Sequence, residues 1–188
     1  MSRYTDHVAK WRNCRRCNLC KSRHNVVLLR GHVPCQVLFV GEAPGTSENL
    51  LGKPFSGPAG NLLNRMLAEA LPPSVTYAIT NLVGCIPKDT EEGAGKNKLG
   101  EPPTYAIEAC KPRLVEIVQI CQPKIIISVG KLAKKWLPIL LADTYRLGED
   151  YKTADIIHPA AILRADVSQQ GLAIQRSLVT IQDAVEDL

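Results

Sequence analysis

Short apolar runs alternate along this chain with longer segments of helical periodicity, and the two patterns predict strands and helices. Residues 124–129 form a nearly continuous apolar run, which is typical of a parallel strand covered on both faces. The run at residues 37–40 has the same character and is followed by two Gly/Pro-rich loops. The predicted strands are Val26–Leu29 at an edge of the sheet, Val37–Val40, Val75–Thr80, Lys124–Val129 and Thr153–Ile157.

Helices are predicted between these strands. Pro58 begins one through Leu71, in which apolar side chains recur on one face, and Pro72-Pro73 ends it. The other predicted helices span residues 5–12, 104–121, 130–141 and from about 168 onward, and residues 86–103 are predicted as an exposed loop. Strands that alternate with helices predict an α/β fold, a three-layer α/β/α sandwich with a mainly parallel sheet of about four strands, in a single domain over residues 1–188.

Composition narrows the class of protein only a little. The 188 residues are 45% hydrophobic and 22% charged, which is ordinary for a globular protein with a sizeable core. No run reaches the length of a membrane span, and the N-terminus lacks the apolar stretch of a secretory signal, so we expect a cytoplasmic protein. The net charge of +5 suits a polyanionic partner but does not require one.

Polar side chains follow three of the predicted strands. Glu42, Asn81 and His158 stand at carboxyl ends, and these ends share one sheet edge, where open α/β sheets hold ligands. Phe55 lies in a nearby glycine-rich loop, where an aromatic ring can stack on a flat ligand such as a base. Each residue also has a purely structural interpretation: Phe55 as a core cap, His158 as a turn residue, Asn81 as a strand cap and Glu42 as the partner of a rim lysine.

Seven cysteines in a chain without an export signal indicate metal binding rather than disulfides. Cys14 and Cys17 have the C-x2-C spacing with which two thiolates share one metal centre. Cys85 and Cys110 are the best distant partners because each borders a polar loop. Four thiolates suit either a structural zinc ion or a [4Fe-4S] cluster, and spacing alone does not separate the two.

The remaining cysteines leave alternatives open. Cys20 is also at ligand spacing from Cys17, and either distant cysteine could be a small buried hydrophobic residue instead. Cys35 and Cys121 adjoin strand starts and are expected in the core.

Six motifs follow one another along the chain: Cys14-x2-Cys17-x-Leu19-x3-Arg23, Gly41-Glu42-Ala43-Pro44-Gly45 with Glu48, Gly52-x-Pro54-Phe55-x-Gly57-x-Ala59-Gly60, Thr80-Asn81-Leu82-Val83-x-Cys85, Ala109-Cys110-x-Pro112-x-Leu114 and His158-Pro159-Ala160-Ala161. Each is modestly specific, but together and in this order they are highly specific. Over most of its length the chain resembles the family 4 uracil-DNA glycosylases, the iron–sulfur branch of the uracil-DNA glycosylase superfamily.

The resemblance implies a [4Fe-4S] cluster held by Cys14, Cys17, Cys85 and Cys110, with Cys20 as a non-ligand. It also implies an enzyme: a DNA repair glycosylase that flips uracil out of DNA and hydrolyses its N-glycosidic bond. Free uracil leaves, and an abasic site remains in single- or double-stranded DNA. We expect such a protein to act as a monomer.

The implied pocket recognises the flipped base. Phe55 would stack on the uracil, and Asn81 would read its edge with a side-chain amide that both donates and accepts. His158 would hydrogen-bond the uracil O2 as negative charge builds on the departing base, beside main-chain amides near Gly41.

Two carboxylates complete the implied site. Glu42 and Glu48 would lie near the sugar and the attacking water, where a carboxylate can stabilise positive charge and orient the water. Because no nucleophile with an adjacent base is evident, we expect a dissociative mechanism without a covalent intermediate.

One segment departs from the family pattern. Twenty-four residues separate Cys85 from Cys110, more than the usual family spacing, and Ile86-Pro87 stands where the family has Arg-Pro. The inserted residues carry three lysines that could alter contacts with DNA: Lys88, Lys96 and Lys98.

DNA contacts are also predicted after the last strand, in a loop at residues 159–164. Leu163 is expected to enter the base stack as a wedge, while Arg164 binds a phosphate. The alternative is that Ile162 and Leu163 begin the next helix and face the core. Lys131, at the start of a helix near the pocket, is predicted to bind a further phosphate, unless it belongs to a solvated helix face.

Two functions of other classes compete with the enzyme. The first is a non-catalytic iron–sulfur protein that binds uracil-containing or damaged DNA, which an assay of uracil release would separate from the enzyme. The second is a zinc-stabilised nucleotide-binding module, which would lack the brown colour and the absorption near 400 nm of an iron–sulfur protein.

Overall fold

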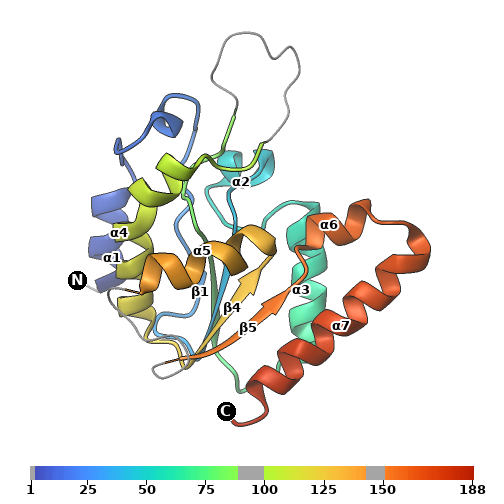
Figure 1. Cartoon of the computed structure of the whole chain (residues 1–188). Coiled ribbons are helices and arrows are strands. Elements are labelled where there is room, and N and C mark those ends of the chain that lie inside the picture. Colours follow the sequence, from blue (N-terminus) through green and yellow to red (C-terminus); the bar gives the residue numbers. More distant parts are fainter. Residues whose placement is uncertain (1–2, 89–99, 143–150) are drawn as a thin grey trace.

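A computed structural model of the chain describes residues 3–88, 100–142 and 151–188. At its centre is a five-stranded sheet in the order β1-β3-β2-β4-β5 (Figure 1). Four strands run parallel, and β1 runs antiparallel to β3 at one edge. The strands are β1 (Arg30–Gly31), β2 (Val37–Gly41), β3 (Tyr77–Asn81), β4 (Ile125–Val129) and β5 (Lys152–Ile156).

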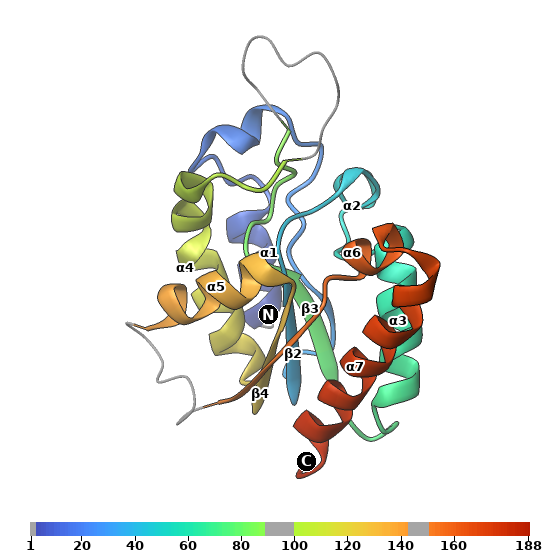
Figure 2. The same cartoon turned by 45° about the vertical axis from the view of Figure 1, so that its right-hand side comes forward.

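Helices cover both faces of the sheet, as Figure 2 shows. One face carries α3 (Pro58–Ala70), α6 (Pro159–Arg164) and α7 (Val167–Val185), which pack against one another. The other carries α1 (Arg3–Trp11), α4 (Thr104–Cys121) and α5 (Lys131–Leu141). The predicted three-layer α/β/α sandwich is therefore confirmed, with one more strand than expected.

Strands β2 and β4 are buried along their whole length, and all of their side chains except that of Ser128 are apolar. In β2, Leu38 and Val40 belong to the core on the α4 side, whereas Val37 and Phe39 belong to the core on the α3 side. Alternate side chains of a strand point to opposite faces, so a strand between two helical layers has no position for a solvated residue.

The strand register brings the carboxyl ends of the parallel strands together at one edge of the sheet. Gly41 of β2 pairs with Asn81 of β3, and Val129 of β4 pairs with Ile156 of β5. We call this region the carboxyl edge and define it by Glu42, Asn81 and His158. The short helix α2 (Thr46–Leu51) lies at the same end of the sheet (Figure 1).

The predicted strand at Val26–Leu29 is wrong. These residues pack in or against the core, but their backbone bonds irregularly: the Val27 amide donates to the Gly84 carbonyl at 2.7 Å, and the Leu28 carbonyl accepts from the Thr80 hydroxyl at 2.6 Å. Apolar sequence reports burial, and here burial occurs without a ladder of strand hydrogen bonds.

Two further expectations need correction. Residues 159–164 form helix α6 rather than a loop, because Pro159 is favourable at a first helical position and the His158 side chain caps the helix. In the segment 86–103, Ile86 and Pro87 are buried rather than exposed, and residues 89–99, with Lys96 and Lys98, lie outside the described residues. Of the helices described, none combines the length and apolar character needed to cross a membrane.

Candidate functional site

The carboxyl edge borders a cavity of about 730 Å³. Glu42 and His158 line it, together with Gly130 between β4 and α5. Asn81 and Phe55 are not among its lining residues; they lie behind it, 2% and 5% exposed. The edge therefore has an open part near Glu42 and His158 and a closed part near Asn81.

His158 is held as a neutral hydrogen-bond donor. Its Nδ1 accepts a hydrogen bond from the Ala160 amide at 3.1 Å, so the ring proton is on Nε2. Burial and, to a smaller extent, the nearby charge of Arg164 lower the pKa of His158 to about 4, while Glu48 opposes both effects. A neutral imidazole with a fixed tautomer can donate through Nε2 without first losing a proton.

Glu42 is fixed by the start of α5. Its Oε1 accepts from the Leu132 amide at 3.2 Å, and burial raises the pKa of this carboxyl group. Gly130 makes the approach possible, because a Cβ there would lie 2.5 Å from Glu42 Oε1 and 3.0 Å from the His158 Cβ. Sequence analysis missed Gly130, although a glycine directly between a buried strand and a helix is a usable signal.

Glu48 joins the two glycine-rich loops. Its Oε2 accepts from the Gly45 amide at 3.1 Å, and its Oε1 accepts from the amides of Ser56 and Gly57 at 3.1 Å each. These three bonds make Glu48 a positioning residue for both loops. Its predicted place near the sugar and the attacking water stays a prediction.

Phe55 lies at the buried end of the site and has a left-handed backbone conformation, with φ of 52°, which is uncommon for a residue other than glycine. Its ring centroid lies 5.7 Å from that of His158 at an interplanar angle of 32°. A Cβ on Gly41 would lie 2.6 Å from the same ring, so glycine is required there. The ring also belongs to the core on the α3 side, so Phe55 both caps the core and faces the site.

Asn81 has a buried acceptor without a partner. Its Oδ1 makes no hydrogen bond within the described residues and lies 2.4 Å from where a Gly41 Cβ would be. A buried polar atom without a partner is costly in a folded protein, and such an atom at a strand end indicates a ligand. The strand-cap interpretation does not explain this unused oxygen.

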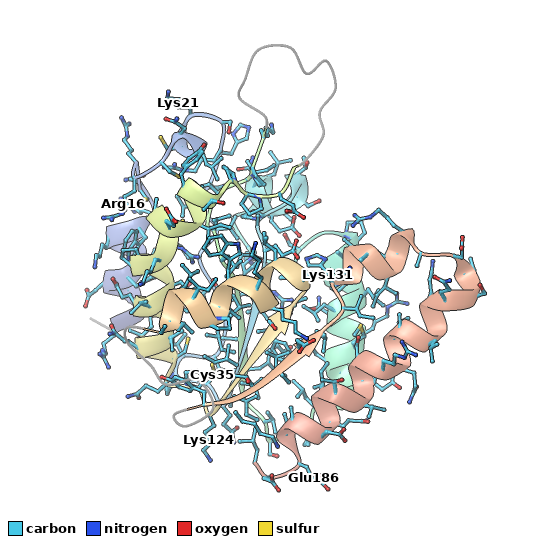
Figure 3. All side chains as sticks on the ribbon, viewed as in Figure 1. Arg16, Lys21, Cys35, Lys124, Lys131 and Glu186 are labelled. Atoms are coloured by element: carbon cyan, nitrogen blue, oxygen red, sulfur yellow. The ribbon has the colours of Figure 1, made fainter. Side chains whose placement is uncertain are left out.

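Two of the three predicted DNA-contacting residues line the cavity, and the third lies on the neighbouring helix α6. Lys131 and Arg164 line it, and Figure 3 shows Lys131 at the end of α5 nearest α6. Leu163 is 42% exposed, whereas Ile162 is 1% exposed in the core, so the core alternative applies to Ile162 only. Lys134 pairs with Asp155 at 3.0 Å, as expected of a solvated helix face.

The four predicted metal-binding cysteines come from three segments that lie near one another, although no three of the described His, Cys, Asp or Glu side chains are close enough to share one metal ion. Cys14 and Cys17 are half-buried before the short 3₁₀ helix η1 (Asn18–Lys21), while Cys85 and Cys110 are buried. Burial raises the pKa of Cys85 to about 12, with a smaller contribution from the thiols of Cys110 and Cys17. These groups are therefore close enough to influence one another's ionisation. We call them the cysteine site.

The surroundings of the cysteine site fit an anionic group. Two buried arginine nitrogens near Cys85 have no partner within the described residues: Arg23 Nη1 and Arg113 Nε. Both arginines act on Cys85 to favour its thiolate form. Cys20 also lies near Cys17, so geometry alone does not exclude it as a ligand. An iron–sulfur cluster bound by thiolates would supply a negatively charged partner for these arginine nitrogens.

Cys35 and Cys121 lie elsewhere, and their expected place in the core is confirmed. They are 5% and 0% exposed, and the Cys35 amide donates to the Cys121 carbonyl at 2.9 Å. Figure 3 shows Cys35 at the end of the sheet away from Lys131.

Comparison with known proteins agrees with this geometry. The profile of the Uracil DNA glycosylase superfamily matches residues 30–178. The chain is 31% identical over 177 residues to the type-4 uracil-DNA glycosylase of Archaeoglobus fulgidus, covering 87% of this chain and 84% of the relative. The chain belongs to the type-4 uracil-DNA glycosylases.

Other members of the superfamily extend the comparison. The type-4 uracil-DNA glycosylase of Pyrobaculum aerophilum is 33% identical over 167 residues, which is 81% of either chain. The crystal structure of Pedobacter heparinus SMUG2 aligns with a TM-score of 0.60 over 81% of this chain and 77% of its own, at 15% identity. The uracil-DNA glycosylase fold is thus shared even where the sequence has diverged.

Proposed function

We propose that this type-4 uracil-DNA glycosylase removes uracil from DNA by hydrolysing the N-glycosidic bond, with one domain carrying both the base pocket and the cysteine site. The observation that carries the proposal is the buried, unpartnered Oδ1 of Asn81 beside Phe55 and His158. A uracil edge offers a donor at N3 and an acceptor at O4, which match the acceptor and donor of one amide. With the amide held in this orientation, cytosine would place an acceptor at N3 against Oδ1 and a donor at N4 against Nδ2, so neither hydrogen bond would form.

The chemistry begins with the extrusion of the base from the stack, which costs a few kcal/mol and least for a mispaired base. Phe55 then offers a ring face to the uracil, and Asn81 holds its edge. Asn81 and Phe55 are buried next to the cavity and do not line it. Side chains that cover these two residues must therefore move when the base enters.

His158 assists the departure of the base. As the glycosidic bond breaks, negative charge develops on uracil O2, and the Nε2–H of neutral His158 donates a hydrogen bond to it. The tautomer is already set by the Ala160 amide, so no reorganisation is needed. One preorganised donor of this kind contributes about 3 kcal/mol to the stability of the transition state.

Glu42 is proposed to act near the sugar, since it lines the same cavity as His158. An ionised carboxylate stabilises the positive charge that develops on the sugar and orients the attacking water. Its position is fixed by the Leu132 amide, and Glu48 keeps the neighbouring loops in place.

Contacts with DNA are proposed around the cavity. Lys131 and Arg164 bind backbone phosphates, because both line the cavity and have basic side chains. Leu163 lies on α6 with a partly exposed apolar side chain and fills the gap left by the flipped base.

Cys14, Cys17, Cys85 and Cys110 are proposed to hold a [4Fe-4S] cluster. Within the described residues, no three His, Cys, Asp or Glu side chains gather tightly enough for a single metal ion. The four thiolates would hold the cluster, and the nearby unpartnered nitrogens of Arg23 and Arg113 would balance its negative charge. When bound, the cluster supplies a structural crosslink between three segments.

The decisive experiment uses labelled oligonucleotides that contain uracil, hypoxanthine or thymine, as single strands and as duplexes. We expect release of uracil and alkali-labile abasic sites from uracil-containing strands only. Tight binding without release would favour the non-catalytic DNA-binding protein instead. A colourless protein that contains zinc would contradict the iron–sulfur cluster, but it would leave the conclusion about uracil excision unchanged.

A further inference from the structure

Arg113 connects the cysteine site with the residue proposed to read uracil. It lies on α4, three residues after Cys110, and is only 1% exposed. Its Nη2 donates to the Asn81 carbonyl at 2.5 Å and to the Leu82 carbonyl at 3.0 Å. Its Nη1 donates to the Thr80 hydroxyl at 3.3 Å. A single guanidinium thus contacts three successive residues around Asn81.

These bonds replace a missing strand. β1 pairs with β3 at Ala78 and Ile79, and beyond that point no strand of the described ranges pairs with the outer side of β3. On the inner side, the Leu82 amide donates to the Gly41 carbonyl at 2.9 Å. Buried carbonyls need donors, and the planar fork of an arginine can serve two at once. Arg113 and β2 therefore hold the Asn81–Leu82 peptide from opposite sides.

The same side chain reaches toward the cysteine site. A Cβ on Gly84, the residue before Cys85, would lie 3.5 Å from Arg113 Nε. Within the described residues, no carboxylate forms an ion pair with Arg113. A buried charge is costly unless an opposite charge is near, and metal-bound thiolates at Cys85 and Cys110 would supply one, since Arg113 acts on Cys85 and lies three residues after Cys110.

We propose that Arg113 is a positioning residue that couples the two regions: its charge is balanced by the metal-bound thiolates, and its fork fixes the peptide that orients Asn81. This proposal rests on the proposed role of Asn81 in reading uracil. It predicts that uracil recognition depends on a residue that touches neither the base nor the DNA.

Two substitutions separate charge from geometry. Arg113→Lys keeps the positive charge but loses the fork, so we expect the iron content and reduction potential of the wild type. Its kcat/KM for uracil excision should fall about 10- to 100-fold, because small misplacements of a recognition group cost this much. Arg113→Gln loses the charge too, and its cluster should have a lower reduction potential, since a nearby positive charge favours the reduced state.

Arg23→Gln is the matched control, because Arg23 acts on Cys85 but has no hydrogen bond to Asn81 or Leu82. We expect it to lower the reduction potential as Arg113→Gln does, while the kcat/KM for uracil excision stays that of the wild type. An equal fall of this kcat/KM in Arg23→Gln and Arg113→Lys would overturn the coupling.

A double-mutant cycle with Asn81→Ala provides the strictest test. If Arg113 acts through Asn81, Arg113→Lys should change excision by less than about twofold in the Asn81→Ala background, because the two effects are not additive. Full additivity, or a wild-type kcat/KM in Arg113→Lys, would overturn the proposal while leaving uracil excision intact. If the wild type releases no uracil, the proposed function fails, and the same cycle is run on affinity for uracil- against cytosine-containing oligonucleotides.

Discussion

The carboxyl edge and the cysteine site lie at the same end of the sheet, but they are stabilised in different ways. At the carboxyl edge, His158 and Glu42 are oriented by backbone amides of the chain itself. At the cysteine site, burial raises the pKa of Cys85, and neighbouring arginine nitrogens have no partner within the described residues. Glu42 and His158 are therefore oriented by the polypeptide alone, whereas the unpartnered arginine nitrogens at the cysteine site fit the bound anionic group proposed above.

The largest expected effect tests this difference directly. Replacement of Cys85 by Ala should abolish iron binding and cooperative folding together, because the binding energy of a structural metal is also folding energy. Iron analysis and a thermal melt would measure both. Cys20→Ala is the control and should keep the full iron content. Loss of iron in Cys20→Ala with retention in Cys85→Ala would refute the assignment of ligands.

At the carboxyl edge, a substitution should affect chemistry and leave folding intact. His158→Ala removes the donor to the departing base, so kcat should fall about 100- to 1000-fold. The iron content and the absorption near 400 nm should stay unchanged. Single-turnover assays on a uracil oligonucleotide measure the rate of cleavage of the N-glycosidic bond. A rate within threefold of the wild type would exclude the role of His158 as a hydrogen-bond donor to the departing base.

The free energy of unfolding should depend on pH through the titration of His158. The folded protein keeps His158 neutral down to a pKa of about 4, below the ordinary value of 6.5. Between these pH values the unfolded state binds more protons, so the free energy of unfolding should fall by roughly 3 kcal/mol as the pH decreases from 7 to 4.

Urea unfolding at several pH values, with His158→Gln as the reference, isolates this contribution from the other titrating groups. The difference in unfolding free energy between the two proteins should be constant above pH 7. Below pH 6.5 it should change steadily, and a difference that is independent of pH would show that His158 titrates normally.

The smallest effect is expected at the rim of the carboxyl edge. Leu163→Ala should reduce excision from duplex DNA about tenfold, because the loss of one contact with the base stack costs about 1–3 kcal/mol. Excision from single strands should stay unchanged, since no stack must be opened there. Its melting temperature should barely change, because the side chain is 42% exposed.

The neighbouring Ile162 is the matched control. Ile162→Ala should destabilise the fold by about 2–5 kcal/mol and affect both substrates alike, since this side chain is 1% exposed. If Leu163→Ala also loses stability and acts equally on both substrates, Leu163 is a packing residue and not a wedge.

Much of the architecture was predictable because its strands and helices have strong periodicity. Residues 104–121 form the predicted helix, and the apolar runs at residues 37–40 and 124–129 lie in central strands. The error at residues 26–29 has a simple origin: these residues are mostly buried, but Thr80 and Gly84 satisfy their backbone irregularly. Apolar composition does not distinguish such a segment from a strand.

The site was predictable only in part. Glu42, Asn81 and His158 could be placed together because strand ends converge, and the cysteines could be grouped by their spacing. Arg113 was missed, although an arginine within the apolar face of a helix, three residues after Cys110, is an unusual position for a charge.

The sequence by itself determined the layered α/β fold, the family and the residue types available for chemistry, because periodicity and ordered motifs are local properties of the chain. Only the tertiary structure decided the states of those residues. The neutral tautomer of His158, the unpartnered Oδ1 of Asn81 and the arginine that links Asn81 to the cysteines all arise from contacts between segments distant in sequence. Burial and hydrogen bonding set protonation and orientation, and neither is encoded in any one motif.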